Sequence, residues 1–161
     1  IEHHKSYETH INILALLNPN RVFDKSGYGF RCSTGLTFIF IHYFHKLFKL
    51  NNFLSKKLPN INMFLDLVAL ATVCDVVPLI DLNRAFVFQG LKIFSKRQNI
   101  GLKILSDESQ LNKKPDEEDL GFFFGPRINA GGRVGKSNIG EKLLISEDEN
   151  EIGRASGRER V

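Results

Sequence analysis

Residues that could carry acid–base or metal chemistry occur at two places far apart in the sequence. Glu2, His3 and His4 follow one another, and Asp75 stands inside the most apolar stretch, residues 65–79. A buried carboxylate must be neutral, paired or bound to a metal, because burying an unpaired charge is too costly. We therefore expect chemistry at Asp75. The alternative is a helix cap, or a carboxylate satisfied by backbone N–H groups.

The two adjacent histidines predict two different roles. Neighbouring side chains on an extended backbone point to opposite faces, so His3 and His4 would not both bind one metal there without a turn. One of them can be a ligand while the other reaches a substrate. The alternative is a solvated chain end.

A glycine-rich segment, residues 125–137, combines four glycines with the cations Arg127, Arg133 and Lys136. Glycines let the backbone approach a ligand, and arginine is well suited to phosphate. Ser137 can cap a following helix, whose first N–H groups attract anions. We expect an anion-binding loop here, the alternative being a mobile surface turn.

The same segment also matches a relaxed P-loop over residues 130–137, with Asp75 as the end of a Walker B strand. This gives a second hypothesis, a nucleoside-triphosphate-binding protein. Pro126 and Arg127 interrupt the strand that should precede such a loop, and the order of the two motifs is reversed. We therefore favour the phosphate-contacting interpretation.

Apolar periodicity predicts the elements that position these residues. We expect a buried strand over 11–17, a helix capped by Ser33 or Thr34 and ending near Leu50, a buried helix from about 62 to Asp75, a helix over 82–96, a further turn at 101–105 and a short helix over 138–145.

Composition limits the class of protein. The 161 residues, 42% hydrophobic with fourteen Phe, suffice for one core, and Asp66 and Asp75 interrupt the longest candidate for a membrane span. Cys32 and Cys74 are too few for a disulfide framework, so we expect a reducing cytoplasm. Residues 153–161 contribute +2 of the net charge of +4 and read as a non-native tail. With Ile1 at the start, we expect a piece of a longer protein.

An ordered set of motifs resembles one enzyme family. The set comprises Glu2-His3-His4, residues 16–21, residues 65–79, Asn83-Arg84, and residues 125–133. Together they resemble the RecJ single-stranded-DNA-specific exonucleases of the DHH phosphoesterase superfamily, over roughly residues 1–150. The resemblance implies an α/β fold: the C-terminal part of a DHH domain with a connecting helix (1–105), a linker (106–119) and the beginning of a second, DHHA1-type domain (120–152), before the tail at 153–161.

The activity that the resemblance implies is that of a two-metal phosphodiesterase using Mn²⁺ or Mg²⁺. Such an enzyme degrades single-stranded DNA from its 5′ end to mononucleotides in DNA repair and recombination. The implied partners are single-stranded DNA and a single-stranded-DNA-binding protein, with no membrane. Two alternatives stay open beside the P-loop: a DHH phosphodiesterase acting on short oligonucleotides or cyclic dinucleotides, and a DNA-binding remnant without activity.

Site roles follow by the same resemblance. His3 and Asp75 resemble metal ligands of the catalytic site, and His4 resembles the catalytic histidine that contacts the scissile phosphate. The three remaining positions, expected to face the DNA, are Arg127, Asn129 and Arg133.

Two departures from the family pattern affect the expected activity. Glu2 stands where the family has Asp, so its extra methylene could misplace a contact that orients His3. Two upstream carboxylate motifs of the family are absent. We therefore expect the isolated polypeptide to be inactive or nearly so.

Overall fold

The structure, a computed structural model, describes residues 1–5, 12–51, 58–109, 111, 113–133, 139–146 and 148, without the side chains of 130–133 and 139. Its described part is helical and contains no strand. The elements are α1 (Ser33–Leu50), a 3₁₀ turn (Ile61–Phe64), α2 (Leu65–Cys74), α3 (Asp81–Phe94), α4 (Ile100–Glu108), a π-helix (Asp119–Phe124), α5 (Gly125–Arg133) and α6 (Ile139–Ile145). None of the described helices is long and apolar enough to cross a membrane.

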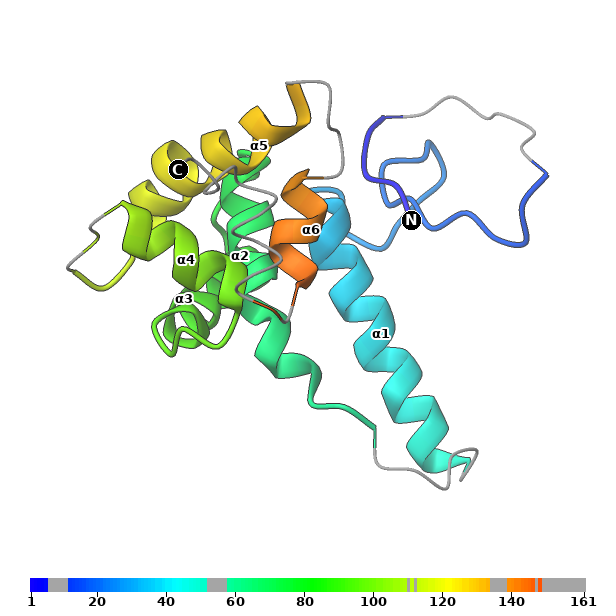
Figure 1. Cartoon of the computed structure of the whole chain (residues 1–161). Helices are drawn as coiled ribbons and strands as arrows, with labels where there is room; N and C mark the ends of the chain where they lie inside the picture. The colour runs from blue at the N-terminus through cyan, green and yellow to red at the C-terminus, as the bar shows by residue number, and fades with distance from the viewer. Residues whose placement is uncertain are drawn as a thin grey trace.

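Helices α2 and α3 form the centre of the molecule (Figure 1). Their close approach depends on Gly90, because a Cβ there would lie 2.2 Å from the Leu65 carbonyl oxygen and 2.4 Å from the Ala69 Cβ. Any side chain would push the helices apart. Around this contact the core consists of Ala69, Leu70, Val87, Phe94, Leu102, Leu105, Leu120 and Phe124.

The π-helix joins this core to α5. Leu120 and Phe124 are fully buried, and Phe124 meets Phe94 edge to face with ring centroids 4.9 Å apart. At the junction with α5, a Cβ at Gly125 would lie 2.5 Å from the Cys74 sulfur. The glycine therefore lets α5 begin directly against the end of α2.

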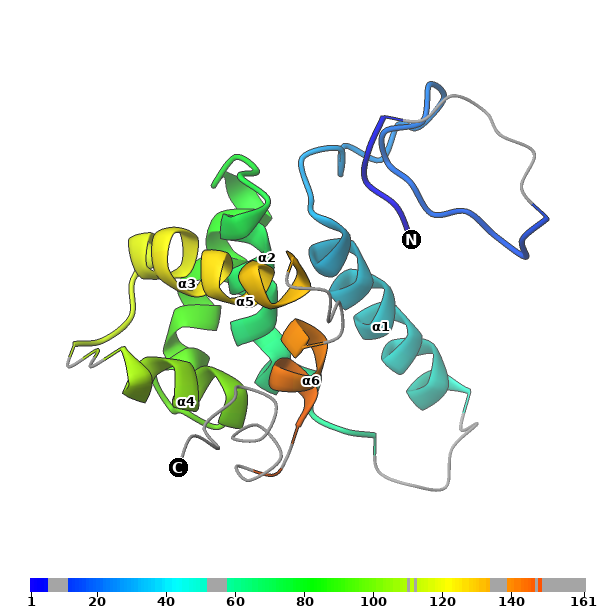
Figure 2. The ribbon, with the colours of Figure 1, turned by 45° about the horizontal axis from the view of Figure 1, so that its top comes forward.

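Helix α1 is only partly packed. Its first half contacts the core through Phe38, whose ring meets Phe86 of α3 edge to face at 5.5 Å. Further along, Phe40, Tyr43 and Phe44 are more than 40% exposed. In Figures 1 and 2, α1 extends away from the other helices towards its C-terminal end.

The helices predicted at 62–75, 82–96 and 138–145 are confirmed within a few residues. The strand predicted at 11–17 is wrong for the described residues 12–17, which form no regular structure. A strand needs neighbours for its backbone hydrogen bonds. Here one backbone bond joins this segment to the N-terminal residues, from Glu2 N to Leu17 O at 2.9 Å. The α/β expectation is therefore not met in the described part.

Two local predictions are also corrected. The cap of α1 is Cys32, whose sulfur accepts a hydrogen bond from Gly35 N at 3.4 Å, rather than Ser33 or Thr34. The predicted glycine-rich loop is helical over Gly125–Arg133, since Gly125 lies against Cys74 and continues the π-helix into α5.

The predicted linker begins inside a helix, because α4 extends to Glu108 and buries Ser106. The division into domains stays a prediction. Ser137, Lys136 and the tail at 153–161 lie outside the described residues.

Candidate functional site

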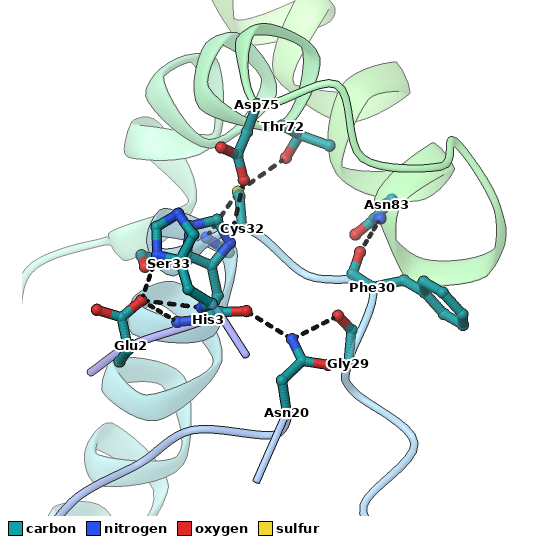
Figure 3. A network of polar contacts seen from close by, with 12 residues as sticks. Glu2, His3, Asn20, Gly29, Phe30, Cys32, Ser33, Thr72, Asp75 and Asn83 are labelled. Carbon is teal, nitrogen blue, oxygen red and sulfur yellow. Dashed lines mark hydrogen bonds and ion pairs between the residues drawn. The ribbon is translucent and has the colours of Figure 1, made fainter. Parts of the chain in front are cut away.

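His3 and Asp75, 72 positions apart in the sequence, meet in the folded chain. The His3 Nδ1 lies 3.1 Å from the Asp75 Oδ2, with 15% and 35% of the two side chains exposed. Figure 3 shows Asp75 at the top and His3 below it, within a polar network that joins the N-terminal segment to α2. Asp75 is therefore paired, as expected, although it is half-exposed at a helix end rather than buried.

Asp75 is placed by the end of α2. It is the C-cap residue, and its N–H donates to the Ala71 carbonyl at 2.9 Å. The next residue, Val76, turns the chain with a φ of 54°. That left-handed conformation is costly for a β-branched side chain and is often found beside functional groups. The tight turn stops the helix and leaves the carboxylate at its tip.

His3 is placed by two asparagines of the following loop. Asn20 Nδ2 donates to the His3 carbonyl at 2.5 Å and to the Gly29 carbonyl at 2.9 Å. Asn18 Nδ2 donates to the His4 carbonyl at 3.0 Å. The sequence indicated only a turn at Asn18-Pro19-Asn20. Residue spacing could not show that the two asparagine side chains donate hydrogen bonds to the histidine carbonyls, some fifteen residues earlier.

A third asparagine, Asn83, ties this loop to the helical core. It is 1% exposed, and its Nδ2 donates to the Phe30 carbonyl at 2.6 Å and to the Pro78 carbonyl at 2.8 Å. The loop before α1 and the turn after α2 are thus held by one side chain (Figure 3).

Glu2 contacts His4 rather than the His3 ring. Its Oε1 accepts hydrogen bonds from the backbone N–H of His3 at 2.7 Å and of His4 at 2.9 Å, and lies 2.7 Å from the His4 Nδ1. These donors, the His4 backbone first, lower the pKa of Glu2 to about 2. An ionised carboxylate only accepts, so the His4 Nδ1 carries the proton and its Nε2 stays available. Among the described residues, Glu2 makes no hydrogen bond to the His3 ring.

The His3–Asp75 pair fits one divalent ion. Neighbouring ligands of an octahedral ion at about 2.1 Å lie about 3 Å apart, close to the observed 3.1 Å. The pair borders a pocket of about 250 Å³ that also reaches Ser33, Thr34 and Cys74. These two side chains place one ring nitrogen and one carboxylate oxygen side by side.

Glu2, His3 and His4 also bring three ligand atoms within 4.8 Å of one another. The Glu2 Oε1 already receives three donors. The Glu2 carboxylate of this cluster is therefore engaged in hydrogen bonds to the two histidines.

The expected phosphate-contacting residues lie on α5. Gly125 places the start of this helix against Cys74, the neighbour of Asp75. Arg127 and Asn129 are exposed. Arg133 is the last residue of α5, and its side chain is outside the described part. The fold therefore brings the beginning of the 125–133 motif to the end of the 65–79 motif.

Asp66 is a carboxylate that the sequence argument passed over. It is 3% exposed in the first turn of α2, and burial raises its pKa despite a hydrogen bond from Leu67 N at 2.7 Å. Asp66 stands in the same apolar run as Asp75 and is the more deeply buried of the two carboxylates.

Comparisons with known proteins identify relatives of one kind. No family model matches the sequence. Similar proteins named single-stranded-DNA-specific exonuclease RecJ include that of Haemophilus influenzae, 34% identical over 159 residues, with 96% of this chain and 27% of the relative covered. The Escherichia coli protein is 41% identical over 100 residues, with 61% of this chain and 17% of the relative covered. The chain thus spans about a quarter or less of these relatives.

A solved structure of a RecJ protein is also similar to this chain. The crystal structure of RecJ in complex with Mn²⁺ from Thermus thermophilus matches with a TM-score of 0.63 and 29% identity, covering 77% of this chain and 18% of that one. The resemblance to RecJ is thereby confirmed.

Proposed function

We propose that this RecJ-like chain forms part of a metal-dependent exonuclease that degrades single-stranded DNA from the 5′ end to mononucleotides. The single observation that carries the proposal is the meeting of His3 Nδ1 and Asp75 Oδ2 at 3.1 Å. Residues of two separate RecJ-like motifs thus form one pair suited to a divalent ion. DNA repair and recombination in the cytoplasm, with a single-stranded-DNA-binding protein as partner, belong to the same proposal.

His3 and Asp75 would hold Mn²⁺ or Mg²⁺, and Mn²⁺ is the ion named for the Thermus structure. A bound metal pair would supply an activated water and stabilise the leaving oxygen. His4, whose Nδ1 is engaged by Glu2, would contact the scissile phosphate. Arg127, Asn129 and Arg133 would contact the DNA backbone, which positions a strand without reading its sequence.

The 161-residue chain alone should have little activity. Divalent ions of this kind take about six ligands, whereas His3 and Asp75 supply two atoms from the described residues. Robust Mn²⁺-dependent hydrolysis of single-stranded DNA by the purified chain would contradict this part of the proposal.

The decisive experiment is a titration of the chain with Mn²⁺. Binding is measured by calorimetry and by the paramagnetic broadening of histidine NMR signals. We expect His3→Ala and Asp75→Ala each to weaken binding by more than about tenfold, as for a lost ligand. His42→Ala, on the exposed side of α1, is the matched control. Equal Mn²⁺ affinity in all four proteins would overturn the metal assignment.

Substrate tests separate the alternatives. The exonuclease hypothesis predicts better binding of long single strands than of dinucleotides, and an oligonucleotide or cyclic-dinucleotide phosphodiesterase predicts the reverse. A DNA-binding remnant would bind single strands without needing His3 or Asp75. The P-loop hypothesis predicts ATP binding that Lys136→Ala abolishes; the π-helix and α5, in place of a strand and a loop over 119–133, weigh against it.

A further inference from the structure

Arg127, one of the expected phosphate contacts, is an exposed side chain held in a defined position. The carbon at the centre of its guanidinium lies 3.5 Å from the centroid of the Phe123 ring. Its Nη1 also donates to the Phe123 carbonyl at 3.2 Å. A cation this close to an aromatic face is attracted by the ring. Phe123 therefore contacts Arg127 through both its ring and its backbone.

The Phe123 ring is itself anchored in the core. It meets Phe124 edge to face with centroids 5.0 Å apart, and the fully buried Phe124 meets Phe94 in the same manner at 4.9 Å. Three aromatic rings thus connect the α3 core with the surface at the start of α5, the yellow region of Figure 1. Phe123 thus connects the Arg127 guanidinium to the buried core.

The charge of Arg127 is not neutralised by any described carboxylate. Two other cations of the helical region do have such partners: Arg97 is paired with Asp107, and Lys113 with Asp116 and Asp119. Nor does the described part offer a hydrogen-bond acceptor to the Arg127 Nε or Nη2. The planar fork is therefore free to receive an anion, and a phosphate accepts such a fork with two parallel hydrogen bonds.

We propose that Phe123 is a positioning residue that holds Arg127 ready for a backbone phosphate of single-stranded DNA. The inference rests on the proposed function and adds the residue through which Arg127 acts. An arginine that is ordered beforehand loses less rotamer freedom on binding. The neighbouring Phe122 provides a comparison, because 85% of that residue is exposed.

The test measures binding of a fluorescein-labelled oligo(dT) to the 161-residue chain by anisotropy over a series of salt concentrations. Arg127→Ala should lower the affinity and reduce the salt slope by about 0.7, the loss of one phosphate contact to a single strand. Phe123→Leu should weaken binding about threefold, the scale of an exposed cation–π contact. Phe122→Leu should leave the affinity unchanged, and Phe123→Tyr, which keeps the ring, should bind like the parent.

A double variant distinguishes positioning from general damage. If Phe123 acts through Arg127, adding Phe123→Leu to Arg127→Ala causes no further loss. Additive losses, or equal effects of the Phe122 and Phe123 variants, would overturn the inference. Circular dichroism checks that each variant folds.

An NMR measurement supplies a readout that does not depend on DNA. The ring should shift the Arg127 δ-proton signals upfield in the parent chain, and Phe123→Leu should abolish that shift. If the shift is absent in the parent chain, the inference about Phe123 is overturned, while the proposed function is not affected. A shift without any oligo(dT) binding contradicts both the inference and the DNA part of the proposed function, while the Mn²⁺ titration still reports on the metal site.

Discussion

The two partners of the His3–Asp75 pair are held in place by different means. Asp75 ends a helix whose buried face packs against α3 at Gly90, so apolar packing fixes it. His3 lies in a segment without helix or strand, where Asn18 and Asn20 donate hydrogen bonds to the backbone carbonyls of the histidines. One ligand of the proposed metal thus depends on the core, and the other on a few polar contacts.

This difference determines how each half should respond to change. Buried apolar contacts are shared by many residues, and removing one weakens the entire helical unit. Partly exposed hydrogen bonds order a segment locally, and such segments open at a lower free-energy cost than the core does. The histidine side of the site should therefore be the more easily disordered side.

The largest expected effect is that of Phe124→Ala. Phe124 is fully buried against Phe94, so the change should lower the free energy of unfolding by about 3–5 kcal/mol. Urea denaturation followed by circular dichroism measures it. Phe122→Ala is the control and should stay within about 0.5 kcal/mol of the parent. Equal effects of the two variants would show that the helical unit is not held by this core.

A smaller and local effect is expected for Asn20→Ala. The change leaves the carbonyls of His3 and Gly29 without their donor, which should cost about 1–3 kcal/mol in the opening of this segment. Amide hydrogen exchange should accelerate around His3 and Gly29 and stay unchanged in α2 and α3. Asn51→Ala, which removes a donor to Leu47 at the end of α1, is the control. Faster exchange throughout α2 would contradict a separate histidine segment.

The smallest effect concerns Asp66 and depends on pH. Because burial raises its pKa above the ordinary 3.8, the folded chain holds this proton more tightly than the unfolded chain does. Stability therefore falls as the pH rises from 3.8 through the raised value, and stays lower above it. Asp66→Asn should raise the melting temperature at pH 7, and the gain should shrink on acidification.

Asp24 gives the control with the opposite sign. Hydrogen bonds from Ser26 lower its pKa, so Asp24→Asn should remove a contribution that is present at neutral pH and lost in acid. If both variants showed the same pH trend in thermal unfolding, the assignment of burial as the dominant cause at Asp66 would be wrong.

The sequence by itself determined where most helices lie and which kind of protein the chain resembles. Apolar periodicity located α3 because a helix must turn one face to the core. For α2, the alanine content of the apolar run together with helical offsets favoured a buried helix over a strand. The ordered motifs at 1–4, 65–79 and 125–133 indicated a RecJ-like protein, since residue types and their order are properties of the chain alone. Arg127 was likewise selected by its type within a glycine-rich motif.

Only the tertiary structure decided which partners these residues meet. Distances between His3 and Asp75, or between Gly125 and Cys74, follow from packing between elements that local spacing does not encode. The same holds for Glu2, whose side chain contacts the His4 ring. The prediction of a strand over 11–17 was wrong for residues 12–17 for the same reason. A helix satisfies its own backbone, whereas a strand depends on neighbours elsewhere.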